Sequence, residues 1–548
     1  MYKKKALTLA VTTLTGLNAP NLNAKTHHDR VDVLEARVHE LEAKLEKALV
    51  ALDAATSKQA AATAAPAPDV KKIDQKVKLI ERKLEVEKEA ADAKWAKLPK
   101  NVELGTQGLK VVSNDENFIM YLRALIQADG SYYMGDDQAS DSTNSNGDGY
   151  VDRFYMRRVR PIIEGTVWKW FDYRIMPDFG MGTTRLFDAY LDFRYFREAS
   201  LAGGKFKAPV SLERLQSASA LPFIERAFPT QLAPNRDIGF MLHGEFDKPG
   251  YETHFSPLER NKTHGGNFPM FQYPDFFSYQ VGVFNGSRNN GNIDSDTNDS
   301  KVVQGRIFSH PFLNTGIEPL DGLGIGIAGT WGQQNDDQLS NYQSPGLNNI
   351  FVYNNAARGD GTQYRVYPQG YWIWGPFQLV GEYALSSQVV ANQTIKNFYT
   401  ENEYELTQND HAWNVTASYI LTGEHNSFLN QGISPRHPFD PLSGNWGAFQ
   451  VAARWSYIDF DNDIFRNVGT ESKPVYPFAD PRRSVSDATT WALGANWWFN
   501  PNFKLMADYS QTSFNDGAGI YNQSGALTPV IASRETEKVW QTRIQLNF

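Results

Sequence analysis

From residue 101 to its end, the chain alternates apolar and polar residues with a period of two. In the last stretch, Trp540, Thr542, Ile544, Leu546 and Phe548 alternate with Gln541, Arg543, Gln545 and Asn547. The same alternation runs through 118–129, 449–457 and 187–194, where Phe187, Ala189, Leu191 and Phe193 share the apolar face. Strands of about ten residues with one apolar and one polar face are typical of an antiparallel transmembrane β-barrel. A soluble sandwich also alternates, but its strands are usually nearer five or six residues.

The segments between the strands differ in length. Residues 500–502 (Asn-Pro-Asn) indicate a tight turn, whereas 136–149 and 285–300 are long and rich in Asn, Asp, Ser and Gly. Short turns at one end and long loops at the other are typical of outer-membrane barrels. Residues 100–548 suffice for a barrel of about 16 strands, a number that leaves an aqueous channel.

The first hundred residues follow another pattern. Lys3, Lys4 and Lys5 precede an apolar stretch, which predicts a signal peptide over 1–24; a frayed cytosolic terminus is the alternative. Apolar residues from Val31 to Leu52 and from Val70 to Leu84 then follow a heptad seam. We therefore expect a short α-helical coiled coil in 25–99, and hence an oligomer. The alternative is a single amphipathic helix lying on a domain.

Composition excludes several kinds of function. The chain has no Cys, which excludes disulfides, thiolate metal sites and Cys nucleophiles. Its net charge of −8 is unlike the basic footprint of a nucleic-acid-binding protein. The sequence carries no HExxH, GxSxG or P-loop motif. We therefore predict no enzyme activity, no cofactor, no metal site and no nucleic-acid partner.

Ten short motifs occur in an order that resembles one known family. They include FYMRR at 154–158, FDAYL at 187–191, GKFKAPVSLE at 204–213, FIER at 223–226 and RDIG at 236–239. Further motifs follow up to NWWFNPNFKLMAD at 496–508. In this order and spacing the chain resembles the phosphate-selective porin O and P family. The resemblance implies a 16-stranded homotrimeric porin in the outer membrane of a Gram-negative bacterium. It also implies a loop, here about 205–235, that folds inward and narrows the pore, and a periplasmic place for the coiled coil.

The resemblance also implies an anion site at the constriction. Its positions match Arg123, Arg158, Asp188, Arg214, Ser217 and Arg226, with Arg160 and Arg174 as possible modifiers. In a narrow passage, fixed cations and hydroxyl donors replace the hydration of an anion, and Arg offers phosphate a fork of donors. Asp172 stands where the family has Lys, so we expect this carboxylate to weaken anion binding.

Three functions remain open at this point. The favoured one is passive diffusion of small anions, such as phosphate or polyphosphate, through a water-filled pore. Acidic residues outnumber basic ones after residue 100, so a general or sugar-type channel with little anion preference is an alternative. The third is a mainly structural protein, in which the coiled coil reaches towards peptidoglycan.

Overall fold

The computed structural model describes residues 101–134, 150–247, 276–295, 298–396, 403–428, 432–519 and 527–548, together with Arg82. The chain divides into two units, 1–100 and 101–548, and only the second is described in detail. The predicted signal peptide and coiled coil lie outside the described residues. Within the described part of the chain, no helix is both long and apolar enough to cross a membrane.

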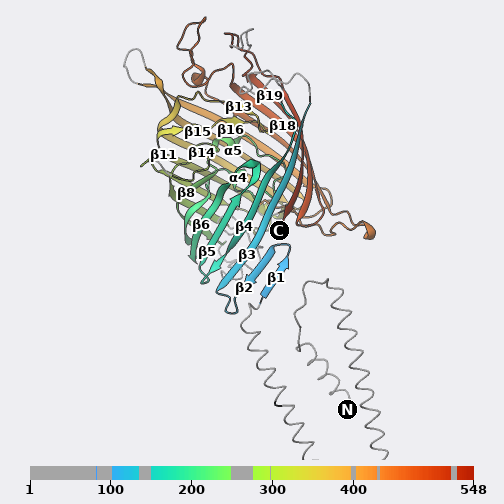
Figure 1. Cartoon of the computed structure of the whole chain (residues 1–548). Coiled ribbons are helices and arrows are strands. Elements are labelled where there is room, and N and C mark those ends of the chain that lie inside the picture. The colour runs from blue at the N-terminus through green and yellow to red at the C-terminus, as the bar shows by residue number, and fades with distance from the viewer. Residues whose placement is uncertain are drawn as a thin grey trace, which may run out of the picture. The chain divides into compact units, whose positions relative to one another are not determined.

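Sixteen strands form a closed antiparallel barrel, as predicted (Figure 1). They are β3 (Phe118–Tyr133), β4 (Arg153–Val167), β5 (Phe171–Asp178), β6 (Arg185–Phe196), β7 (Ala199–Lys207), β8 (Arg236–Phe246), β9 (Phe277–Phe284), β10 (Val302–Ser309), β11 (Gly322–Gln338), β14 (Ala357–Trp374), β15 (Phe377–Lys396), β16 (Glu403–Ile420), β17 (Ala448–Asp459), β18 (Val485–Trp498), β19 (Phe503–Asp516) and β20 (Glu537–Asn547). Each strand pairs with the next, and β20 pairs back with β3 from Val539↔Tyr133 to Asn547↔Leu125.

The barrel closes where β20 pairs with β3, and we name this pairing the closing seam. A short hairpin extends the wall next to it. It consists of β1 (Asn101–Gly105) and β2 (Gly108–Val112), and β2 pairs with Ile119–Leu122 of β3. These are the β3 residues that precede the β20 partners, so the edge left by the end of β20 is covered. Asn502, in the β18–β19 turn, donates to the carbonyl of Thr106 at 2.7 Å and ties the hairpin to the rim.

The predicted faces are confirmed along most of the wall. On β20, Trp540 and Ile544 are 46% and 55% exposed on the outside, whereas Gln541 and Arg543 are 2% and 1% exposed. On β3, Met120 and Leu122 face outward and Arg123 faces inward. An apolar outer face matches lipid, and a polar inner face matches a watery lumen.

Several strand pairs of the described residues shift register, and two of these β-bulges, in β4 and β6, re-aim side chains; one corrects our assignment of Phe187 to the apolar face. Met176 and Pro177 pair with Asp188 and Leu186, so Phe187 is the extra residue of β6. In the β3–β4 pair, Gln127 and Ala128 pair with Arg158 and Met156, which leaves Arg157 as the extra residue of β4. A bulge re-aims the extra side chain. As a result, Phe187 and Arg157 both line the lumen.

The ends of the barrel only partly follow the expected division into short turns and long loops. The turns between β4 and β5 and between β18 and β19 are short, as predicted for 500–502, where Asn500 accepts from the backbone of Asn502 and Phe503. However, β8 and β16 end at the same end as these turns, and the connections that follow them, 247–276 and 421–447, are long. β3 and β9 end at the opposite, loop end, and the long polar segments 136–149 and 285–300 follow them; residues 136–149 and 248–275 lie outside the described residues.

Loops fill part of the lumen. Residues 208–235, between β7 and β8, carry α4 (Leu212–Leu215) and α5 (Pro229–Leu232), and we name them the inward loop. Residues 339–356, between β11 and β14, carry β12 (Tyr342–Gln343) and β13 (Asn349–Phe351), and we name them the crossing loop. Among the described residues there are also four 3-10 helices: η1 (Gly180–Gly182), η2 (Glu318–Leu320), η3 (Pro441–Ser443) and η4 (Asn462–Phe465).

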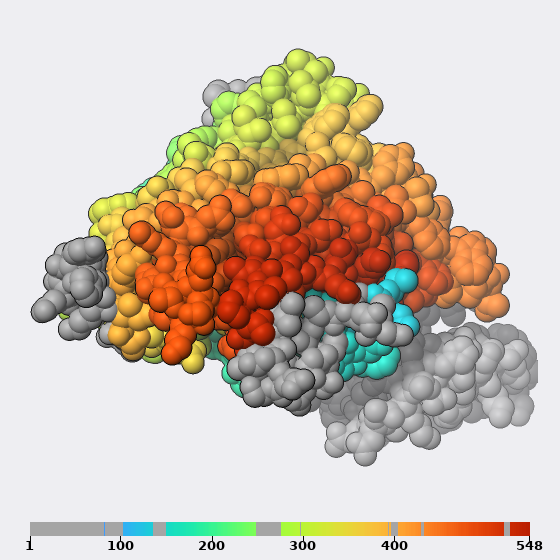
Figure 2. Space-filling view, turned by 90° about the horizontal axis from the view of Figure 1, so that it is seen from above, coloured from blue at the N-terminus to red at the C-terminus, as the bar shows by residue number. Residues whose placement is uncertain are grey.

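The two loops meet in an apolar core inside the barrel. Phe228 and Leu232 of the inward loop, Phe351 of the crossing loop, and Phe460 and Phe478 from the β17–β18 connection belong to one buried cluster. Seen from above in Figure 2, residues from the second half of the chain, in yellow to red, spread across most of the visible face. The packed core occupies the side of β14–β18, so space remains beside β3–β8.

Candidate functional site

A cavity of about 220 Å³ lies between the inward loop and the wall formed by β3–β8. Nine cationic side chains line it: Arg123, Arg157, Arg158, Arg160, Arg174, Lys207, Arg214, Arg226 and Arg236. Only two acidic side chains, Asp188 and Glu225, are among its lining residues. Since like charges gathered in a confined space repel each other, this arrangement favours an anion in the cavity.

Strand β4 contributes three of these cations. Alternation turns Arg158 and Arg160 inward, and the bulge adds Arg157, directly before Arg158. Arg160 pairs with Asp178 at 2.7 Å, and Arg157 binds Glu225 of the inward loop through two bonds of 2.5 and 3.0 Å. Arg158 donates to the neutral amide oxygen of Gln127 at 2.6 Å.

The inward loop is anchored across the lumen to the opposite wall. Glu382 of β15 accepts from the backbone nitrogen of Leu212 at 2.7 Å and from the hydroxyl of Ser211 at 3.0 Å, at the start of α4. Glu213 then pairs with Arg454 of β17 at 2.5 Å and accepts from the nitrogen of Ala227 at 2.8 Å. These contacts fix where the loop presents its own cations.

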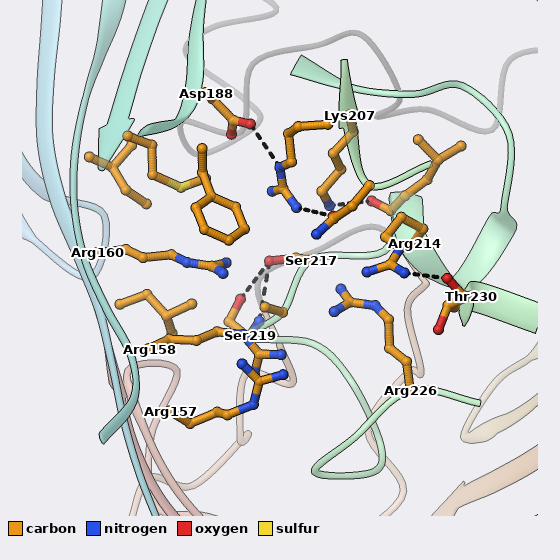
Figure 3. Close-up of a pocket in the computed structure, with 18 of the residues that line it drawn as sticks. Arg157, Arg158, Arg160, Asp188, Lys207, Arg214, Ser217, Ser219, Arg226 and Thr230 are labelled. Carbon is orange, nitrogen blue, oxygen red and sulfur yellow. Dashed lines mark hydrogen bonds and ion pairs between the residues drawn. The ribbon is translucent and has the colours of Figure 1, made fainter. Parts of the chain in front are cut away.

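The loop also reaches the closing seam of the barrel. Gln127 of β3 and Gln545 of β20 bond each other at 2.7 Å. Each also donates to the loop backbone, Gln127 to Ala218 at 3.1 Å and Gln545 to Ser219 at 3.0 Å. This places the hydroxyls of Ser217 and Ser219, 2.8 Å apart, in the cavity wall (Figure 3).

Four of the cations have no carboxylate partner among the described residues. They are Arg158, Lys207, Arg214 and Arg226, which donate to amide or carbonyl oxygens. Figure 3 shows the side chains of Arg158, Arg214 and Arg226 reaching towards Ser217 and Ser219. The Nε atom of Arg214 is buried without a hydrogen-bond partner in the described structure. The site therefore holds cationic charge that no ion pair among the described residues neutralises.

Crowding shows in the pKa values of the loop arginines. Burial, followed by the charge of Arg214, lowers the pKa of Arg226 to about 9. Burial and the charge of Arg236 lower the pKa of Arg214 to about 10. Both groups still carry their charge at neutral pH. An anion placed between them would relieve this repulsion.

The remaining cations form ion pairs with carboxylates. Glu164 joins Arg123 at 2.9 Å and Arg174 at 3.0 Å. Asp188 joins Arg174 at 3.3 Å and Arg236 at 3.2 Å. These chains of alternating charge position the guanidinium groups along the wall, but they leave less net charge for a ligand.

Glu225 provides a direct test of how charge acts in the cavity. Burial opposes its ionisation, but the charges of Arg157 and Arg158 outweigh burial and lower its pKa to about 2. Its carboxylate therefore stays charged until the pH falls towards that value. We expect Glu225→Gln to raise the anion-to-cation permeability ratio equally at pH 7 and pH 4, measured by reversal potential in a salt gradient. A difference between variant and native protein that disappears at pH 4 would contradict this.

The structure brings together eight of the nine site residues that we predicted. Arg123, Arg158, Asp188, Arg214, Ser217 and Arg226 all line the cavity, as do Arg160 and Arg174. Asp172 is not among the lining residues. It pairs with Arg194 and accepts from the hydroxyl of Thr166 at 2.7 Å. The ion pair offsets the charge of Asp172, which weakens our expectation that this carboxylate disfavours anions.

Sequence reasoning missed Arg157, Arg236 and Phe187. By simple alternation Arg157 and Phe187 would face lipid, and only the bulges turn them inward. An arginine on a lipid-facing position is costly, so Arg157 was itself a signal of a bulge. Arg236 follows the inward loop directly at the start of β8, where a loop returns to the wall.

Solved structures of outer-membrane proteins show a weak similarity to this chain. A structure of OmpT expressed in the outer membrane of Vibrio cholerae has a TM-score of 0.43 and 8% identity, over 80% of this chain and 100% of that one. The outer-membrane channel DcaP of Acinetobacter baumannii has a TM-score of 0.42 and 10% identity, over 80% and 99%. Salmonella typhi OmpF in complex with daunomycin has a TM-score of 0.39 and 10% identity, over 79% and 99%. No curated protein matches the sequence significantly.

These structural similarities are low, and the assignment rests on the sequence family. The family model for phosphate-selective porin O and P matches residues 126–518, which is most of the chain. The matched region runs from β3 to the end of β19 and contains every cavity residue that we predicted except Arg123. The chain therefore belongs to the phosphate-selective porin O and P family of outer-membrane porins.

Proposed function

We propose that this porin conducts small anions passively and prefers them to cations, with the cavity as its selectivity site. One observation carries the proposal: four cations in the cavity, Arg158, Lys207, Arg214 and Arg226, have no carboxylate partner among the described residues. Desolvated guanidinium groups bind phosphate and carboxylate oxygens through paired, charge-assisted hydrogen bonds. Inorganic phosphate, which the family description names, is the first solute to test.

A general channel with little anion preference is the second candidate. It is favoured by the ion pairs that neutralise Arg123, Arg157, Arg160, Arg174 and Arg236 in the same cavity. We also propose a homotrimer that is exported to the outer membrane, with residues 25–99 in the periplasm. These features are supported by the family resemblance and by the heptad seams.

Removing the unpaired charges separates the two candidates. A charge a few ångströms from a permeating ion is worth about 1–4 kcal/mol between bulk and surface-like dielectric. We therefore expect Arg158→Gln and Arg226→Gln each to lower the anion-to-cation permeability ratio several-fold, and phosphate to block chloride current less. The measurement is the reversal potential of single channels in a KCl gradient.

Arg466→Gln is the matched control, because this arginine is exposed in the β17–β18 connection, just after η4, and does not line the cavity. It should leave the ratio unchanged. If native protein already shows no preference for chloride over potassium, the general channel is the correct description.

A further inference from the structure

Part of the cavity wall is apolar. Ile162 of β4, Met176 of β5, Phe187 and Tyr190 of β6, and Phe206 of β7 line the same space as the cations. On β20, by contrast, the inward positions Gln541, Arg543 and Gln545 are polar. Apolar surface in a watery lumen does not stabilise a hydrated inorganic ion. It is stabilised instead by contact with apolar groups, which removes it from water.

Phe187 differs from its apolar neighbours. Tyr190 and Phe206 pack edge to face at 5.8 Å and belong to a buried cluster with Phe284. Phe187 belongs to none of the buried clusters of the described structure and remains partly exposed. Part of its ring surface therefore remains open to the cavity.

Two cations flank this ring. The guanidinium carbon of Arg160 lies 4.4 Å from the ring centroid, and that of Arg236 lies 4.6 Å from it. Both distances are within the range of cation–π contacts. The β-bulge interrupts the regular β5–β6 pairing at Phe187 and turns its side chain inward. The ring is thereby placed between the two arginines.

A ligand with two kinds of surface would satisfy this arrangement. Its carboxylate would be bound by the unpaired cations, and its flat apolar body would lie against the open part of Phe187. The cavity, at about 220 Å³, is smaller than the roughly 300–1,000 Å³ typical of sites for drug-sized ligands. It therefore suits a body of a single ring.

From this geometry we propose that the cavity preferentially takes small aromatic carboxylates, and that Phe187 is the residue that selects them. This inference rests on the proposed function, because it uses the same cations, but it names a class of solute that charge alone does not distinguish.

The test compares three anions on the full-length protein in planar bilayers at pH 7. Benzoate, acetate and phosphate are each titrated against chloride current, and the concentration for half-block is measured. We expect benzoate to block at about tenfold lower concentration than acetate. In Phe187→Ala the ratio of the half-block concentration of acetate to that of benzoate should fall from about ten towards one, and Phe187→Leu, which keeps an apolar side chain, should show an intermediate ratio.

Phe193→Ala is the matched control, because Phe193 is on the same strand but faces outward, with 39% exposure. Using the ratio of two anions removes any common effect on conductance.

If the native protein selects chloride over potassium but benzoate and acetate block its current at equal concentrations, this inference is wrong and the proposed function stands. If the preference for benzoate persists in both Phe187 variants, the assignment to Phe187 is overturned. If chloride is not preferred over potassium, the proposed function itself fails.

Discussion

Arg454→Met is expected to release the inward loop and widen the channel. Arg454 pairs with Glu213 at 2.5 Å, donates to the carbonyl of Glu225 at 2.7 Å, and lies over the ring of Phe223 at 4.4 Å. Removing one member of a buried ion pair costs about 3–5 kcal/mol, because the other charge stays buried without compensation. We expect a higher single-channel conductance, a lower anion-to-cation ratio and a lower temperature of heat unfolding.

A double substitution separates the effect of the unpaired Glu213 charge from the effect of the changed side chain at position 454. In Glu213→Gln/Arg454→Met no uncompensated carboxylate remains, so much of the lost heat stability should return, as a double-mutant cycle would show. Arg466→Met, at an exposed arginine, should change none of these three properties: conductance, selectivity and heat stability. Native conductance and selectivity in Arg454→Met would mean that the ion pair does not hold the loop.

Glu537→Ala is expected to undock the crossing loop from the wall on the far side of the barrel. Glu537, at the loop end of β20, accepts from Ser344 at 2.9 Å, from Asn348 at 2.8 Å and from the nitrogen of Gly346 at 3.3 Å. Tyr133 of β3 adds a bond to the carbonyl of Gly346 at 2.7 Å. A buried donor left without a partner costs about 1–3 kcal/mol, so losing several shifts the docking equilibrium tenfold or more.

The undocked state should be visible in single-channel recordings. Ser344 and Leu347 line the cation-rich cavity, so the docked loop covers part of it. We therefore expect larger conductance and more current fluctuation in Glu537→Ala. Glu535→Ala is the control, because Glu535 is exposed two residues away. Native conductance and native current fluctuation in Glu537→Ala would show that the loop does not limit current.

Alternation was enough to predict the wall of this barrel. Lipid and water impose opposite demands on the two faces of every strand, so the inward direction of Arg123, Arg158 and Arg543 could be read from single strands. A bulge, by contrast, is a property of two paired strands. The sequence of β6 alone does not show that Phe187 is skipped by its partner, nor does β4 show that Arg157 is.

The cavity could be predicted only through the resemblance, because its residues come from distant segments. Arg226 meets Arg158 only because Glu382 and Arg454, on strands more than 150 residues later, hold the inward loop in place. Asp172 shows that the direction of a side chain can be predicted without its partner. Its place on the inner face was correct, but its partner Arg194 lies on a neighbouring strand, and that pair offsets its charge.

The two glutamines at the closing seam have a consequence for how the barrel assembles. Gln127 and Gln545 are separated by 418 positions in sequence, yet they share a bond and both hold the backbone of the inward loop. Contacts between such distant parts of a chain form late in folding, because a long segment must be ordered before they are made. Here the first and last strands and the loop between them complete one another's hydrogen bonds. The wall and its constriction should therefore mature in a single cooperative event, so that an open, unrestricted cylinder would not accumulate on the way to the folded channel.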